Sequence, residues 1–210
     1  MAEEQRQTRD RERTAAAILA AAERLLAQEG FRHFGVNAIA REAGCDKQLI
    51  YRYFGGTEGL ADAIGRQIAR RGNEPVVGSP TSYLEFVEQS LLAYLEALRR
   101  DPLAQQIAAW ETAEDSPLIE RLSVARTGAL LRQLDAPELS PPLGVDAPAI
   151  NALLLGAIQQ MVLSANRRGG FAGVPLTEDR NWIRVRLALR TLIRGAYRVA
   201  RGAADGVGAA

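Results

Sequence analysis

Apolar residues recur every three to four positions along almost the whole chain, and this helical spacing constrains the fold more than any other feature. In the first such run, Ile18, Leu25 and Leu26 lie on one side of a helix. Gly30 ends that helix. No segment of four or more residues combines clean apolar–polar alternation with enrichment in β-branched residues, the pattern of a half-buried strand. The sequence therefore predicts an all-α protein without strands.

Glycines, prolines and capping residues divide the chain into a series of predicted helices. These span residues 13–29, 36–43, 47–54, 57–71, 81–100, 102–112, 116–134, 147–168 and 177–201. The connecting segments rich in proline or glycine are residues 73–80, 135–148 and 169–175. We expect Asp46, Thr57 and Thr177 to be N-caps, because short polar side chains accept hydrogen bonds from the first turn of a helix.

The composition disfavours most catalytic and metal chemistry. Cys45 is the only cysteine and His33 the only histidine, so the chain offers no internal disulfide, no Cys-based zinc site and no Ser-His-Asp arrangement. We expect no enzyme activity, no metal and no cofactor. The chain has no run of about 18 apolar residues and no apolar core in residues 1–13. It therefore predicts neither a membrane span nor a secretion signal, and a cytoplasmic protein.

Residues 36–54 have the spacing of a helix-turn-helix. Two short helices meet at a tight turn that begins at Gly44, and the small side chains of Ala40 and Ala43 let the helices approach closely. Ile39, Ile50 and Phe54 are predicted to face inward.

The second of these helices carries hydrogen-bond donors, one apolar contact and two phenolic hydroxyls on its free surface, a mixture that suits the DNA major groove. They are Lys47, Gln48, Leu49, Tyr51, Arg52 and Tyr53. Lys47 and Gln48 lie at the helix N-terminus, where recognition helices place base-reading side chains. The alternative is a plain helical hairpin in which Tyr51 and Tyr53 are half-buried packing residues.

A longer string of residues surrounds this segment. It consists of Gly30-Phe31, Ile39-Ala40-Arg41-Glu42-Ala43-Gly44, Leu49-Ile50-Tyr51-Arg52-Tyr53-Phe54, Glu58 and Leu60. Their order and spacing resemble the N-terminal domain of TetR-type one-component transcriptional regulators. The resemblance begins near Thr14, and the rest of the chain fits by length and helical layout only.

The resemblance implies an all-α homodimer in which three N-terminal helices bind operator DNA and a larger helical domain binds a small molecule. We accordingly expect a DNA-binding domain over residues 1–56, with a flexible arm over 1–12. A ligand-binding and dimerisation domain is expected over 57–210, with a flexible tail over 202–210. The implied function is that of a repressor released from its operator by a small hydrophobic ligand. The alternative is a helical ligand-binding dimer with weak or lost DNA binding.

Carried over by position, the resemblance assigns eight residues to the DNA-facing surface. They are Asn37, Lys47, Gln48, Leu49, Tyr51, Arg52, Tyr53 and Thr57. The roles implied are base-edge contacts for Asn37, Lys47 and Gln48 and a thymine-methyl contact for Leu49. Phosphate contacts are implied for Tyr51, Arg52 and Tyr53.

Two positions and the charge balance depart from the family pattern. Gly35 stands where a capping Thr or Ser is usual, and Thr57 stands where a lysine is usual. Residues 1–60 carry nine basic and nine acidic side chains. DNA affinity should therefore depend on where charges lie and should show a shallow salt dependence. The arm arginines, at positions 6, 9, 11 and 13, are candidates for minor-groove contacts.

The predicted last helix carries an arginine sector, for which a solvated face is the favoured interpretation over an acidic-lipid or nucleic-acid surface. Its members are Arg180, Arg184, Arg186, Arg190, Arg194, Arg198 and Arg201. The resemblance implies that this helix and helix 147–168 form a four-helix dimer interface.

Ligand-contact candidates are polar or aromatic residues in otherwise apolar helices, although core packing explains them equally well. They are Tyr94, Gln106, Trp110, Gln159 and Met161. We find no charged residue clearly inside an apolar helix face, which favours a neutral, hydrophobic ligand.

Overall fold

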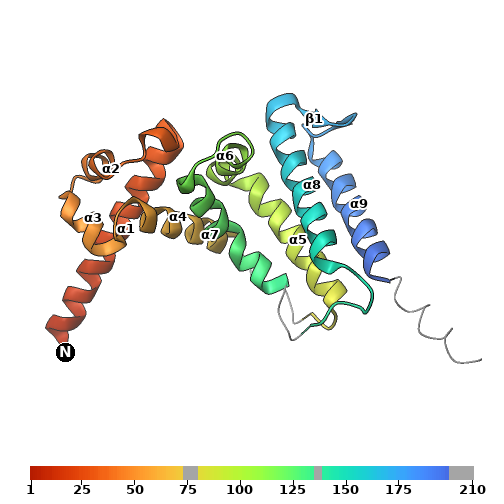
Figure 1. Ribbon diagram of the computed structural model, residues 1–210, viewed down its shortest axis with the longest axis horizontal. Helices are drawn as coiled ribbons and strands as arrows, with labels where there is room; N and C mark the ends of the chain where they lie inside the picture. The colour runs from red at the N-terminus through yellow and green to blue at the C-terminus, as the bar shows by residue number, and fades with distance from the viewer. Residues whose placement is uncertain (73–79, 135–138, 199–210) are drawn as a thin grey trace, which may run out of the picture. The chain divides into compact units, whose positions relative to one another are not determined.

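The computed structural model describes residues 1–72, 80–134 and 139–198, which are mostly helical (Figure 1). The predicted all-α class is therefore confirmed. The helices are α1 (Ala2–Glu29), α2 (Val36–Ala43), α3 (Lys47–Phe54), α4 (Thr57–Gly72), α5 (Tyr83–Arg100), α6 (Pro102–Glu111), α7 (Pro117–Leu134), α8 (Ala147–Arg168) and α9 (Asp179–Arg198). A short 3-10 turn, η1 (Phe31–His33), follows α1.

Helix α1 begins at Ala2 and so continues through the residues for which we expected a flexible arm. Residues 2–13 are mainly Glu, Gln and Arg, which are strong helix formers. The Thr14 hydroxyl donates to the Asp10 carbonyl oxygen at 2.9 Å, and Arg13 forms an ion pair with the Asp10 carboxylate at 3.2 Å. The expected tail over residues 202–210 lies outside the described residues.

The segment between α8 and α9 corrects the expectation of a protein without strands. Strands β1 (Gly170–Phe171) and β2 (Val174–Pro175) form a small antiparallel pair. Ala172 and Gly173 connect them with positive φ angles of 48° and 79°, which suits the twist of a two-residue hairpin. Strands of two residues are too short to show any alternation, so the sequence pattern missed them.

Two of the three predicted N-caps are also wrong. Helix α9 begins at Asp179, two residues after Thr177. Thr57 is already the first residue of α4, so it does not occupy the position before the helix. Asp46 is confirmed as the cap of α3, because its carboxylate accepts a hydrogen bond from the Gln48 backbone N–H at 2.7 Å.

The chain forms two compact units. The first contains residues 1–70 and 102–129, and therefore groups α1–α4 with α6 and most of α7. Its core is built from side chains on the inner faces of these helices. The largest fully buried ones are Ile18, Leu26, Ile39, Ile50, Leu60, Ile64, Ile107, Ile119 and Leu122. The buried set follows the helical spacing of the sequence, so these faces supply the apolar burial that holds the unit together.

The second unit contains residues 71–101 and 130–210, and within it α5 packs against α8 and α9 (Figure 1). Arg190 and Arg194 both reach the Glu88 carboxylate of α5, at 3.2 and 2.8 Å. Arg186 reaches Glu96 of α5 at 2.7 Å. The arginine sector of α9 is thus partly an ion-paired seam against α5. Arg190 and Arg194 nevertheless remain exposed, which agrees with the interpretation as a solvated face. The Arg198 side chain and all of Arg201 lie outside what the structure describes.

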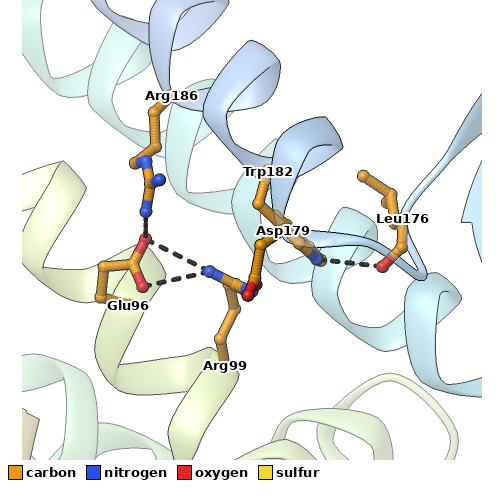
Figure 2. A network of polar contacts seen from close by, with 6 residues as sticks. All are labelled: Glu96, Arg99, Leu176, Asp179, Trp182 and Arg186. Atoms are coloured by element: carbon orange, nitrogen blue, oxygen red, sulfur yellow. Dashed lines mark hydrogen bonds and ion pairs between the residues drawn. The ribbon is translucent and has the colours of Figure 1, made fainter.

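Figure 2 shows the contacts that connect α5 with the start of α9 and with Leu176, the residue after β2. The Arg99 guanidinium lies 4.3 Å from the centre of the Trp182 ring and forms ion pairs with Glu96 and Asp179. The Trp182 indole N–H donates to the Leu176 carbonyl oxygen at 3.0 Å. Because Trp182 is buried, these contacts fix the start of α9 against α5.

Candidate nucleic-acid interface

The turn between α2 and α3 follows directly from its sequence. Gly44 adopts the left-handed conformation, with φ 62° and ψ 35°, which a residue without a Cβ adopts at little cost. The Cys45 backbone N–H donates to the Ala40 carbonyl oxygen at 3.0 Å and closes the end of α2. Asp46 then caps α3, as described above. The three residues 44–46 therefore form a tight turn that joins two helices of eight residues each.

Burial fixes which face of α3 points outward. Ile50 and Ile39, which is on α2, are 0% exposed, so both helices turn their apolar sides into the first unit. Elsewhere on α3, Tyr51 is 56% exposed, and Lys47 is exposed as well. The alternative in which Tyr51 is a half-buried packing residue is therefore wrong.

The other predicted DNA-facing residues lie on or beside this surface. Asn37, Gln48 and Arg52 are exposed. Leu49, Tyr53 and Thr57 are half-buried. The structure thus presents a polar, partly aromatic outer face on α3, and the individual base and phosphate contacts remain predictions.

The balanced charge of residues 1–60 is not evenly distributed. Glu42 of α2 forms an ion pair with Arg24 of α1 at 3.0 Å. Arg121 of α7 forms ion pairs with Glu58 and Asp62 of α4, at 2.8 and 3.0 Å. Several acids are therefore neutralised within the unit. Lys47 and Arg52, in contrast, make no ion pair with any described residue, and their charges remain available on the outer face of α3.

Gly35 occupies the position before α2, and it lacks the side-chain oxygen that a capping residue provides. Its backbone is extended, with φ −133° and ψ 152°, and α2 has no side-chain cap. A Cβ placed at Gly35 would meet nothing within 4 Å. A side chain as small as that of alanine or serine therefore fits this position without strain.

We expect Gly35→Ser to raise the unfolding free energy by a few tenths of a kcal/mol, because the hydroxyl can accept from the first turn of α2. Gly35→Ala is the matched control and should lower it by about 0.5–1 kcal/mol, since alanine is a poor N-cap. Thermal unfolding of the three proteins measures both changes. A serine variant no more stable than the alanine variant would contradict the cap assignment.

The two residues considered for catalysis have local structural roles. A ring nitrogen of His33 lies 3.0 Å from the Glu29 carbonyl oxygen at the end of α1. Partial burial, together with the neighbouring Asp46 carboxylate, raises the pKa of the Cys45 thiol. A raised thiol pKa disfavours the nucleophilic thiolate. Among the described residues, no group of three His, Cys, Asp or Glu side chains is arranged to hold a metal ion.

The predicted ligand-contact residues do not gather within one unit. Gln106 and Trp110 of α6 belong to the first unit, whereas Tyr94, Gln159 and Met161 belong to the second. Trp110 packs edge-to-face on Phe31 with ring centres 5.4 Å apart, and the exposed Gln106 amide donates to the Ala27 carbonyl oxygen at 3.5 Å. Both α6 residues therefore contact α1 or η1. Their role in binding a ligand remains a prediction.

The expectation that no charged residue lies inside an apolar helix face is wrong. The Arg126 side chain on α7 is only 3% exposed and forms an ion pair with Glu111 of α6 at 3.2 Å. The Glu88 side chain on α5 is 13% exposed and is held by the two arginines of α9. Sequence periodicity missed these charges because a paired charge can be buried at a position that looks exposed on a helical wheel. The reason for expecting a hydrophobic ligand is therefore removed.

Comparison with known proteins identifies the N-terminal part of the chain. Residues 18–64, which run from α1 into α4, match the family model of bacterial regulatory proteins, tetR family. An uncharacterized HTH-type transcriptional regulator of Mycobacterium tuberculosis, present in strains H37Rv and CDC 1551, is 34% identical over 101 residues. This match covers 48% of the present chain and 50% of the relative, so it spans about half the length of the curated relatives.

Solved structures share the fold over a larger part of the chain. FadR of Bacillus subtilis, crystallised in complex with stearoyl-CoA, has a TM-score of 0.57 at 17% identity and covers 85% of this chain and 96% of its own. GusR of Salmonella enterica has a TM-score of 0.57 at 19% identity, with 88% and 95% covered. A tetR-family regulator of Shewanella sp. PV-4 has a TM-score of 0.56 at 20% identity, with 87% and 97% covered. At these identities the likeness shows the fold.

Proposed function

We propose that this chain, whose residues 18–64 match the model of bacterial regulatory proteins, tetR family, regulates transcription by binding operator DNA with α3. The observation that carries the proposal is the orientation of α3. Ile50 is fully buried, whereas Lys47 and Tyr51 point to the outside. Donors and a phenol at these positions suit base edges and phosphates in the major groove. The family further supports a cytoplasmic protein and a repressor.

Two copies of the chain are proposed to act together, joined through α8 and α9. Apolar side chains on these helices face outward, with Leu153 74% exposed on α8 and Leu192 61% exposed on α9. Ile183 and Leu187 of α9 are exposed as well. Among the described helices, α8 is also the one long and apolar enough to cross a bilayer by length and composition alone. A second copy covering this surface accounts for its exposure, and the resulting dimer doubles the length of DNA that is read.

Release by a small molecule is the proposed regulation. The support is that B. subtilis FadR, which shares the fold, was crystallised with stearoyl-CoA. A ligand releases DNA only when it binds the DNA-free conformation more tightly than the DNA-bound one. The buried charges of Arg126 and Glu88 leave the polarity of the ligand open. The alternative of lost DNA binding rested on Gly35, Thr57 and a neutral domain, and the exposed cations of α3 weigh against it.

Selection from a pool of random duplexes at low salt tests the proposed function. The purified full chain is expected to enrich a palindrome whose two half-sites lie about one helical turn, roughly 10 base pairs, apart. Low salt favours binding because it strengthens phosphate contacts. Failure to enrich any duplex under these conditions would refute DNA binding, and enrichment of a single half-site would refute the dimer.

A further inference from the structure

One face of α1 continues from the core of the first unit toward its own N-terminus. Ile18 and Leu25, seven positions apart, are 1% and 3% exposed and lie on that face. Arg11 is seven positions before Ile18, so it projects from the same face, one step beyond the buried core. Arg11 itself is exposed.

The other arginines of this segment project from the opposite side of α1. Ala20, which is exposed, lies fourteen positions after Arg6 and seven after Arg13. Ala27, fourteen positions after Arg13, is exposed too. Arg9 aligns in the same way with the exposed Ala16. Arg13 is moreover neutralised by Asp10 at 3.2 Å. Only one of the four arginines therefore shares a face with the buried residues Ile18 and Leu25 of α1.

Arg11 lies against the last turn of α3. The central carbon of its guanidinium is 5.7 Å from the centre of the Tyr53 ring, within the range of a cation–π contact. Figure 1 shows the N-terminal end of α1, in red, extending past α3. Arg11 forms no ion pair with any described residue, so none of the described carboxylates neutralises its charge. A positive charge thus stands at the edge of the proposed DNA-facing surface, beside Arg52 and Tyr53.

We propose that Arg11 and Tyr53 together hold a backbone phosphate at the edge of the half-site read by α3, an inference that rests on the proposed DNA binding. Stacking on the ring restricts the guanidinium while leaving its N–H groups free to donate to phosphate oxygens. The Tyr53 hydroxyl supplies a second donor. Arg6, Arg9 and Arg13 face away and make no such contact. This replaces the expectation that all four arginines reach the minor groove.

The test compares Arg11→Gln with Arg9→Gln, which removes the same charge from the opposite face of the same helix. Fluorescence anisotropy with the duplex selected by the wild-type chain gives Kd over a series of salt concentrations. Loss of one phosphate contact per protomer should reduce the slope of log K against log[salt] by about 1.8. If affinity at 1 M salt is unchanged, that slope corresponds to about 60-fold weaker binding at 0.1 M salt. Arg9→Gln should match the wild type in both measurements.

Arg11→Lys and Tyr53→Phe separate phosphate binding from packing. Lysine keeps the charge and should keep most of the salt slope, whereas phenylalanine keeps the ring and should lose only the hydroxyl contact. Reduced affinity of Arg11→Gln with an unchanged salt slope would mean that Arg11 only positions α3, and would overturn the proposal. Equal losses in Arg9→Gln and Arg11→Gln would overturn it too, by showing a bulk charge effect. A wild-type chain that binds no duplex would instead refute the proposed function itself.

Discussion

Replacing Lys47 and Tyr51 together with alanine is expected to reduce operator affinity about 10³-fold or more, to the level of binding to unrelated duplexes. Each of the two side chains is exposed on α3, whereas Ile50 of the same helix is buried. A good base-edge contact contributes about 1–3 kcal/mol. The Lys47 contacts of two protomers therefore amount to about 2–6 kcal/mol, which spans the roughly 4 kcal/mol that separates specific from non-specific binding. Loss of the Tyr51 phosphate contact lowers the affinity further.

The fold should survive this double substitution, because neither side chain contributes to the buried core. Thermal unfolding should therefore give a midpoint close to that of the wild type, and gel shifts with selected and scrambled duplexes give the affinity. Arg168→Ala is a suitable control, since it removes an exposed cation at the end of α8 in the second unit. A double variant that binds the selected duplex as tightly as the wild type does would contradict the assignment of α3 as the helix that reads the operator.

The helices around the candidate site were predictable because their signals are local. The bounds of α2 and α3 agree with the sequence pattern residue for residue. Gly44 and Asp46 end one helix and begin the next through their own backbone and side-chain preferences, without help from distant residues. The burial of Ile39 and Ile50 follows from helical spacing, and that burial in turn fixes the outward face of α3.

Features that depend on distant partners were not predictable. The arginines of α9 look like a solvated face on a helical wheel, and only the position of α5 shows that Glu88 and Glu96 pair with them. The burial of Arg126 likewise depends on α6 bringing Glu111 within reach. The sequence does show that Arg11 lies seven positions before Ile18 and so on the same face of α1. The contact of Arg11 with Tyr53, however, follows only once the position of α3 is known. In each case the arginine lies on one helix and its contact partner lies on another, so the pattern of a single helix does not predict the contact.

Gly65 within α4 is an example of a constraint that the sequence does not reveal. A Cβ built on Gly65 would lie 2.5 Å from the Ala125 Cβ and 2.7 Å from the Leu122 carbonyl oxygen of α7. These are a short side chain and the backbone, neither of which can rotate away. Helices α4 and α7 therefore approach each other at Gly65 more closely than any other residue would allow. The ion pairs of Arg121 with Glu58 and Asp62 hold the same two helices together.

Gly65→Ala is therefore expected to destabilise the protein, although the same change in an open helix stabilises by up to about 1 kcal/mol. Overpacking at a site that cannot relax costs about 1–3 kcal/mol, and Gly65→Leu should exceed that range. At this chain length each kcal/mol lowers Tm by about 2–4 °C. Gly156→Ala in α8 is the matched control, because a Cβ there meets nothing within 4 Å, and it should leave Tm unchanged or raise it.

A double substitution links the loss to the contact between α4 and α7. Adding Ala125→Gly to Gly65→Ala removes the nearer of the two clashes and should restore part of the lost stability, while the Leu122 carbonyl oxygen keeps the rescue incomplete. Because α4 follows α3 after only two residues, separation of α4 from α7 should also weaken operator binding, and the double variant should recover it in parallel. A Gly65→Ala protein that melts at or above the wild-type Tm would show that the two helices are not in close contact at Gly65.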